Sequence, residues 1–350
     1  IESRVSAAMI ESGLSLVRER IEAVLPILKE EMLDFVIERG LLPPAMRTSP
    51  AVRDLRISLK PAPAFGAAYY TDSGLVEIGD EDFHAYLVRN RLVLNPGKAV
   101  LSLAHECIGH ALQGLWSSPM PEALAGHDMN LWNFTSMPTV EGIGILKEEL
   151  GEEFLRARRA KLGFEVLDGT LNRIRLRDDE IEYAVLANEV ERLQHLLTTY
   201  SQYLALKQRD QPGTDLSEVF AARWGRHLAR SRHTIREKVP SYELVRPEDT
   251  YDFLYNLSYV VGPILIRRLR QRVQEEHPRA WASMTEMERD AVFSAGAWAI
   301  DVFPDWLDFA LRHLEAFRTE YMPAALAEAL PPGSPPADPV APPPRNPRNP

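Results

Sequence analysis

Two histidines and a glutamate stand close together in an otherwise apolar stretch. His105, Glu106 and His110 lie within residues 99–116, where most other side chains are aliphatic. Burying two imidazoles and a carboxylate in an apolar helix is costly unless a bound partner compensates. A divalent metal would be such a partner, because in the His-Glu-x-x-His motif of zinc enzymes the histidines bind the ion and the glutamate acts on water. We interpret this segment as a metal site with a catalytic carboxylate.

The two histidines are five residues apart, one more than in that motif. Five steps along a regular α-helix turn about 140° beyond a full revolution, so the two rings would point apart. A one-residue π-bulge at Gly109 would bring them back together. The alternative interpretation is two unrelated core histidines. A His-Glu-x-x-Gly-His string is expected by chance in about one in a thousand chains of this length, which favours the metal.

A catalytic zinc ion usually has three protein ligands and one open position. We expect the third ligand on a downstream helix, where Glu141 stands early in an apolar helical segment that begins near Pro138. The alternative is a solvated first-turn acid near the helix dipole, but the motif at residues 105–110 favours the ligand. The competing candidates for the third position are His127, Asp128, Glu148 and Glu149.

Other polar residues could act around such a centre. Tyr259, with His233 behind it, could donate a hydrogen bond to the oxyanion of a tetrahedral intermediate, although a plain core aromatic is an equal alternative. Arg270 or Arg267 could bind a substrate carboxylate through two hydrogen bonds. Arginines on an exposed helix are more often solvated, so this assignment is the weaker one.

The elements that must position these residues are mainly helical. Apolar residues at spacings of three, four and seven predict a long amphipathic helix over about 3–39, ending at Gly40. From Gly97 onward the pattern is helical almost to the end. The predicted helices cover about 98–116, 138–162, 178–208, 215–230, 250–276, 285–296 and 300–318.

One segment has a clear β pattern. Residues 64–70 and 75–78 flank Thr71-Asp72-Ser73-Gly74, a sequence typical of a hairpin turn. The first of these strands contains Ala68 and Tyr69, whose free edge could pair with an extended peptide or could merely close the sheet. We expect an α+β fold that is mainly α, with one small sheet.

Composition and charge exclude several classes of protein. The chain has 350 residues, 45% of them hydrophobic, and a formal net charge of −10. This charge gives no cationic field for nucleic acid or anionic lipid, so we expect no such partner. Cys107 is the only cysteine, which excludes an internal disulfide and favours the cytoplasm. No apolar run reaches the roughly 18–20 residues of a membrane-spanning helix.

Three regions are expected along the chain. Residues 1–52 form the N-terminal helix and a linker, and residues 53–330 form the catalytic domain. Residues 331–350 are about half proline with little aliphatic bulk, so we expect a disordered tail. The oligomeric state is left open.

Two blocks of the sequence resemble a known family. His-Glu-Cys-Ile-Gly-His-Ala-Leu-Gln and the later Val-Glu-Gly-Ile-Gly-Ile-Leu-Lys-Glu-Glu-Leu are similar to the paired signatures of a bacterial family of gluzincin-class zinc peptidases, known mainly as a domain of unknown function. That family shows His-Glu-x-x-Pro-Gly-His-His-Leu-Gln and Val-Glu-Gly-Trp-Ala-Leu-Tyr-Ala-Glu. This chain lacks the proline, so its histidine spacing is that of dipeptidyl peptidase III, and Ala111 replaces the second of two adjacent histidines.

The resemblance covers about residues 60–310, and it includes the stretch from Tyr259 to Arg270, which is similar to the family's late Tyr-x-x-Gly helix. It implies a zincin-like helical metallopeptidase architecture with Glu106 as catalytic base. The metal ligands that it implies are His105, His110 and Glu141. Members of this family, and the related thimet-type oligopeptidases and angiotensin-converting enzyme, are usually much longer.

These observations predict a zinc-dependent hydrolase that cleaves peptide or small amide bonds, with Glu106 as general base toward a metal-activated water. One alternative keeps the two-histidine, one-carboxylate site but uses iron or manganese for non-hydrolytic chemistry. A second alternative is a catalytically inactive binding module that retains the motif.

Overall fold

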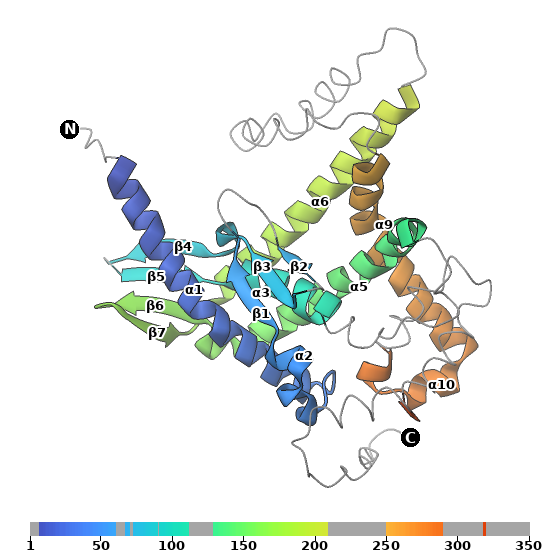
Figure 1. Cartoon of the computed structure of the whole chain (residues 1–350), viewed down its shortest axis with the longest axis horizontal. Helices are drawn as coiled ribbons and strands as arrows, with labels where there is room; N and C mark the ends of the chain where they lie inside the picture. The colour runs from blue at the N-terminus through green and yellow to red at the C-terminus, as the bar shows by residue number, and fades with distance from the viewer. Residues whose placement is uncertain are drawn as a thin grey trace.

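Figure 1 shows the computed structural model, which describes residues 7–60, 67–70, 73–89, 91–111, 129–208, 250–289 and 318–319. The described part is mostly helical with two small sheets, so the α+β class is confirmed. The predicted helix at 215–230, most of that at 300–318 and the tail at 331–350 lie outside the described residues. Among the described helices, none has an apolar stretch long enough to cross a lipid bilayer.

Helix α1 (Ala7–Glu38) is the long N-terminal helix that the periodicity predicts. Its buried face includes Leu28 and Phe35, and the Phe35 ring meets the Phe154 ring edge-on at a centroid distance of 5.3 Å. The helix ends before Gly40, whose φ of +71° is the left-handed conformation that favours glycine there. The predicted end is therefore confirmed.

The first sheet contains the predicted hairpin. Its strands are β1 (Arg56–Leu59), β2 (Ala68–Tyr70) and β3 (Leu75–Ile78), in the order β1-β3-β2. Strands β2 and β3 pair antiparallel, whereas β1 and β3 pair parallel. Strand β2 therefore lies at an edge of this sheet.

A second, four-stranded sheet corrects the prediction of a single sheet. Its antiparallel strands are β4 (His84–Val88), β5 (Arg91–Asn95), β6 (Gly163–Leu167) and β7 (Thr170–Ile174), in that order. The chain after Gly97 is therefore not continuously helical. Asp168-Gly169 joins β6 to β7 with positive φ at both residues, the hairpin turn for which this dipeptide is the typical signal.

The helices around the candidate site cross close to one another. Helix α3 (Gly97–Leu103) continues into a π-helical segment, η3 (Ala104–Ala111). Helix α5 (Met129–Arg158) packs against η3 and against α9 (Thr250–Glu276), and α6 (Asp178–Gln208) packs against α3 and α9. The shorter helices are η1 (Pro44–Thr48), α2 (Pro50–Arg53), η2 (Asp80–Asp82), η5 (Arg159–Lys161) and α10 (Pro278–Ser283).

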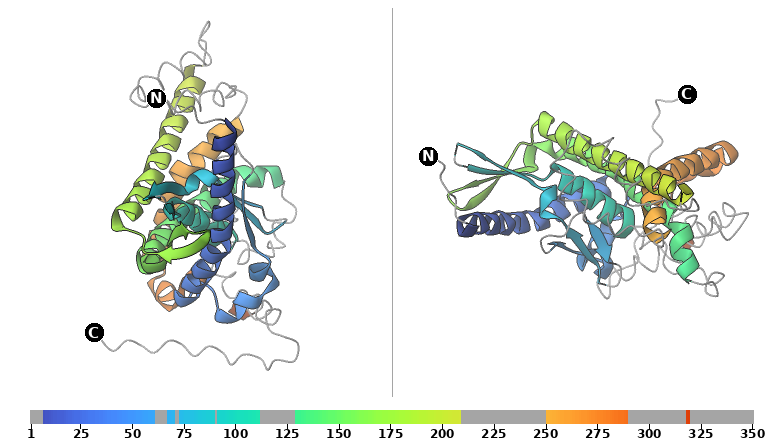
Figure 2. Two further views of the ribbon diagram at one scale, coloured as in Figure 1. Left: turned by 90° about the vertical axis from the view of Figure 1, so that its left-hand side faces the viewer. Right: turned by 90° about the horizontal axis from the view of Figure 1, so that it is seen from above.

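The four-stranded sheet and α1 lie at one end of the molecule, and α9 and α10 lie at the other (Figures 1 and 2). One core of buried apolar side chains joins α1, the first sheet, α3, η3 and parts of α5 and α9. The candidate site is next to this core, where η3, α5 and α9 meet.

Candidate metal centre

The π-helical segment η3 brings His105 and His110 to the same side of the helix. In a π-helix the hydrogen bonds run from residue i to residue i+5, so residues five apart take the place of residues four apart in an α-helix. The two ring centroids are 4.8 Å apart, with the ring planes at 80°. The predicted widening is present, but it covers the whole of Ala104–Ala111 rather than one residue at Gly109.

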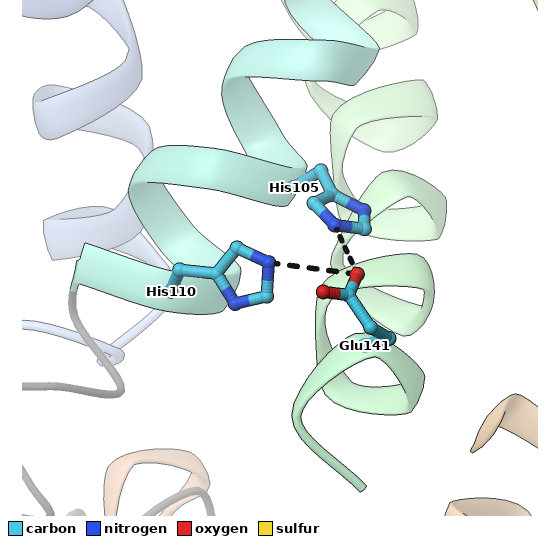
Figure 3. A group of neighbouring side chains, drawn as sticks. All are labelled: His105, His110 and Glu141. Carbon is cyan, nitrogen blue, oxygen red and sulfur yellow. Dashed lines mark hydrogen bonds and ion pairs between the residues drawn. The ribbon is translucent and has the colours of Figure 1, made fainter. Parts of the chain in front are cut away.

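Glu141 completes the group from helix α5. Its Oε2 atom lies 3.3 Å from His105 Nε2 and 3.8 Å from His110 Nε2, and both rings point toward this carboxylate (Figure 3). One potential ligand atom from each of the three side chains lies within 4.8 Å of the others. His105 and Glu141 are both buried, with 6% of their surface exposed. Two imidazole nitrogens and a carboxylate oxygen are donors that zinc accepts, so this group fits the ion.

Glycines of α5 make this approach possible. A Cβ atom on Gly144 would lie 2.7 Å from the His105 ring, and one on Gly142 would lie 2.4 Å from the backbone of Gly262 in α9. A Cβ on Gly109 would lie 2.6 Å from the Gly144 Cα. Gly109 thus packs closely against α5, in addition to lying in the π-helical segment where the sequence predicts a bulge. Any side chain at these positions would push the helices apart.

Glu148 contacts the other nitrogen of His105. Its Oε1 atom lies 2.7 Å from His105 Nδ1, and its Oε2 atom accepts hydrogen bonds from Arg192 Nη2, at 2.6 Å, and from the Asn188 amide. Burial raises the pKa of Glu148, but the bond to His105 and the charges of His105 and Arg192 outweigh it, so the pKa is lowered. A carboxylate on the second nitrogen of a ligand histidine fixes the orientation of the ring.

Glu148 therefore lies beside the group instead of being its third ligand. It follows Glu141 by seven residues, two turns on the same helix, so the spacing already placed both on one face. Glu149 is exposed and pairs with Arg267. The remaining competitors, His127 and Asp128, lie outside the described residues.

The electrostatics of His105 reflect its two acidic partners. Burial lowers the pKa of this imidazole, but hydrogen bonds from its ring to Glu141 and Glu148 outweigh burial and raise the pKa to about 10. For Glu141, burial raises the pKa, but the hydrogen bond to His105 and the charges of His110 and His105 outweigh burial, so the pKa is lowered. A metal ion must therefore compete with a proton for the Nε2 atom of His105.

Glu106, the predicted base, is buried with 7% of its surface exposed. Burial is the main reason that its pKa is raised to about 7, and the charge of Glu141 adds to the increase. His105 and a hydrogen bond from the backbone of Tyr69 act in the opposite direction. The carboxylate therefore lies between the metal-ligand group and the edge strand β2, with a pKa suited to proton transfer near neutral pH.

Tyr259 lies beside the ligands, on α9. Its ring stacks on that of His105 at a centroid distance of 6.2 Å and on that of His195 at 4.7 Å. Its side chain hydrogen-bonds to Glu141 and contributes to the lowered pKa of that carboxylate. This contact differs from the predicted role of donor to an oxyanion, and His233 lies outside the described residues.

The predicted substrate contacts divide into two groups. Ala68 and Tyr69 lie on β2, the strand that contacts η3 and Glu106. Arg267 is exposed and pairs with Glu149, and Arg270 is half-buried farther along α9. Because Arg267 and Arg270 follow Tyr259 by eight and eleven residues, they lie about 12 and 16 Å from it along the helix axis. Strand β2 thus lies beside the site, whereas these two arginines lie two to three helical turns farther along α9, and their predicted contact with a substrate stays a prediction.

Sequence reasoning missed His195, Asn188 and Arg192, three residues of α6 near the site. Each reaches the metal-ligand group through another side chain: His195 through Tyr259, and the other two through Glu148. No motif marks them, because their partners lie at least forty residues away along the chain.

Comparison with known proteins gives no match: no family model fits the chain, and no curated protein or solved structure is significantly similar to it. The residues of the site and their geometry are therefore the basis for assigning a function.

Proposed function

We propose that the protein is a zinc-dependent hydrolase of peptide or other small amide bonds, related to gluzincin-class peptidases and with their zincin-like architecture. The observation that carries the proposal is the convergence of His105, His110 and Glu141, from two different helical elements, to within 4.8 Å. Among the described residues, this is the one group of three such side chains whose potential ligand atoms meet in this way. Two histidines and a glutamate are the ligand set of several zinc peptidases.

A zinc ion held by these three residues would supply a Lewis acid that polarises a carbonyl and makes hydroxide available near neutral pH. Glu106 is the residue that would accept a proton from the attacking water and return it to the leaving amine. In the metal-free protein, burial raises the pKa of Glu106 to about 7, and a bound cation would favour the ionised carboxylate that accepts the proton. The backbone of Tyr69 would help to orient the Glu106 carboxylate.

The edge position of strand β2 favours a peptide as the substrate. Among the described strands its neighbour is β3, so its other edge can accept an extended chain by strand addition. Because the Tyr69 backbone contacts Glu106, a peptide paired along this edge would pass close to the catalytic carboxylate. Ala68 and Tyr69 are thus the proposed substrate-binding residues, in preference to Arg267 and Arg270.

The decisive experiment compares the wild-type protein with Glu106→Gln on a mixed library of peptides and N-acyl amino acids, read by mass spectrometry. We expect the zinc-loaded wild type to cleave some members. Glu106→Gln should lower the rate by about 10²- to 10⁴-fold while it binds one zinc ion as before. Glu149→Gln, a change of the same type at an exposed position, should retain wild-type activity. Equal activity of wild type and Glu106→Gln would contradict the proposal.

The donor set also favours a second candidate. Two histidines and one carboxylate with open positions are the ligands of non-haem iron oxygenases, so iron or manganese could serve a non-hydrolytic reaction here. Metal analysis of protein purified without added metal, followed by reconstitution with zinc, iron or manganese, separates the two candidates. Hydrolysis that zinc restores and iron does not would support the hydrolase.

A further inference from the structure

We propose that Arg192 and Asn188 of helix α6 are positioning residues for the metal centre, which hold Glu148 against His105 and thereby strengthen metal binding. This inference rests on the proposed metal site and adds the element that orients one of its ligands. Neither residue belongs to the His-Glu-x-x-Gly-His block or to the block around Glu141.

The contacts form a chain from α6 through α5 to η3. The two oxygens of Glu148 have different partners: Oε1 lies 2.7 Å from His105 Nδ1, and Oε2 accepts from Arg192 Nη2 at 2.6 Å and from the Asn188 amide. The side chains of His105 and Glu148 are 7% and 11% exposed, and that of Arg192 is 27% exposed. Arg192 therefore connects a buried carboxylate to the outer side of the site.

The two oxygens of Glu148 have different partners, and this has a chemical consequence for His105. If His105 binds the metal through Nε2, its Nδ1 must carry the proton and donate it to an acceptor. A carboxylate with two unoccupied oxygens could rotate away from the ring, whereas two donors from α6 occupy Oε2 and leave Oε1 facing Nδ1. Arg192 also places a positive charge beside a buried carboxylate that would otherwise be costly to keep ionised.

The surrounding part of α6 is itself anchored. The anchor is Glu191, which pairs with Lys98 at 3.0 Å, whereas the pair of Arg192 Nη1 with the exposed Glu189, at 2.8 Å, stays within α6. Lys98 belongs to α3, which continues directly into η3, so one turn of α6 is tied both to the helix before the histidines and to Glu148. This second connection keeps Arg192 in place relative to the ring that it orients.

The test measures zinc affinity of the full-length protein by competition with a chromophoric chelator, together with the visible absorption of the cobalt-substituted protein. Arg192→Met should weaken zinc binding by about 10- to 100-fold and change the cobalt spectrum. Arg192→Lys should lose less zinc affinity than Arg192→Met, because lysine keeps the positive charge. Some loss should remain, because lysine lacks the planar guanidinium group. Glu189→Gln is the matched control, since it removes the other partner of Arg192, and it should bind zinc with wild-type affinity.

A double-mutant cycle separates positioning from general stability. Because Arg192 acts through Glu148, Arg192→Met should have little further effect on zinc affinity in a Glu148→Gln background. An equal loss in both backgrounds would overturn the inference, as would wild-type zinc affinity in both folded Arg192 variants. In those two cases the metal site itself would stand, because the wild type still binds zinc. A wild-type protein that binds no divalent metal would remove the proposed function as well.

Discussion

At the residue scale, the site is a cluster of buried charges that balance in pairs. Glu141 and Glu148 contact the two nitrogens of His105, and Arg192 compensates Glu148 from the outside. Glu106 is the carboxylate here whose pKa is raised, because burial outweighs the nearby charge of His105. A divalent cation beside three carboxylates would offset their mutual repulsion, which agrees with the proposed metal.

Replacing His110 tests the ligand set directly. We expect His110→Ala to lose more zinc affinity than the roughly 10- to 100-fold typical of residues that only orient ligands, because it removes a donor atom. Zinc content after gel filtration in chelator-free buffer measures the loss. His84→Ala, at an exposed histidine of β4, is the control and should retain its zinc. Full zinc retention by His110→Ala would show that His110 is not a ligand.

Tyr259→Phe distinguishes the two roles considered for this tyrosine. The change keeps the ring stacked between His105 and His195 but removes the hydroxyl that bonds Glu141. If the hydroxyl orients Glu141, zinc affinity should fall about tenfold. If instead it stabilises an oxyanion, kcat should fall by about 10²- to 10³-fold with zinc affinity unchanged. The contact in the structure favours the first result, and zinc titration beside steady-state kinetics separates them.

At the scale of elements, the site depends on how closely α5 approaches η3. The π-helical turn aligns the two histidines, but their distance from Glu141 is set by glycines where the helices cross. Gly144 lies against the His105 ring. Gly151 lies against Ala104, the residue of η3 that immediately precedes His105. On the same helix, an added side chain would therefore meet a ligand at Gly144, but at Gly151 it would meet Ala104 and Leu101, which are not ligands.

Gly144→Ala and Gly151→Ala form a matched pair on this surface. An added Cβ would lie 2.7 Å from the His105 ring in the first and 2.9 Å from the Ala104 Cβ in the second. Both should lower the free energy of unfolding, by about 1–3 kcal/mol, because overpacking forces neighbours to move. Zinc affinity should fall clearly in Gly144→Ala and much less in Gly151→Ala. Equal zinc affinities in the two variants, measured beside their thermal unfolding, would contradict this account of the crossing.

At the scale of the whole molecule, α1 is joined to the far end of α5 and to the second sheet through one buried carboxylate. Glu31 accepts a hydrogen bond from Arg173 of β7 at 2.6 Å and pairs with Lys161 of η5 at 2.7 Å. Burial raises the pKa of Glu31, but these two cations outweigh it and lower the pKa below its ordinary value. The ionised form is thus favoured in the folded state.

The stability contributed by Glu31 should depend on pH. Because folding lowers its pKa, the contribution is present above the unfolded pKa of about 4.5 and is lost as the pH falls through the folded value. Glu31→Gln should cost about 1–2 kcal/mol at pH 7, less than a fully buried pair, because Lys161 and Arg173 are partly exposed.

Urea unfolding of the wild type and of Glu31→Gln at pH 7 and near pH 3.5 measures this dependence. The difference between the two proteins should shrink at the lower pH. The exposed residue Glu38, which pairs with Arg158, provides the control: Glu38→Gln should change stability by less than about 0.5 kcal/mol at either pH. A Glu31→Gln effect of the same size at both pH values would mean that charge is not its source.

The sequence alone identified features that depend on local spacing. His105, Glu106 and His110 stand within one turn and a half of helix, and Glu141 stands in the next apolar stretch. The predicted start of that helix near Pro138 was wrong, because α5 already begins at Met129 and includes Pro138 in its interior. The end of α1 at Gly40 and the β2–β3 hairpin have equally local signals, and both are confirmed. The Asp168-Gly169 dipeptide also indicates a hairpin turn. The strands on either side of it are short and lie between two segments with strong helical periodicity, so the pattern does not predict them.

The tertiary structure decided which distant side chains reach this group. Strand β5 pairs with β6, Glu148 receives Arg192 and Asn188, and Tyr259 stacks on His195, each across more than forty residues or between separate helices. Helical periodicity shows which residues share a face, but it does not show which face of another helix will meet them. That choice depends on the side-chain volumes at each crossing, above all at Gly142 and Gly144, and such volumes act only when the helices are packed together.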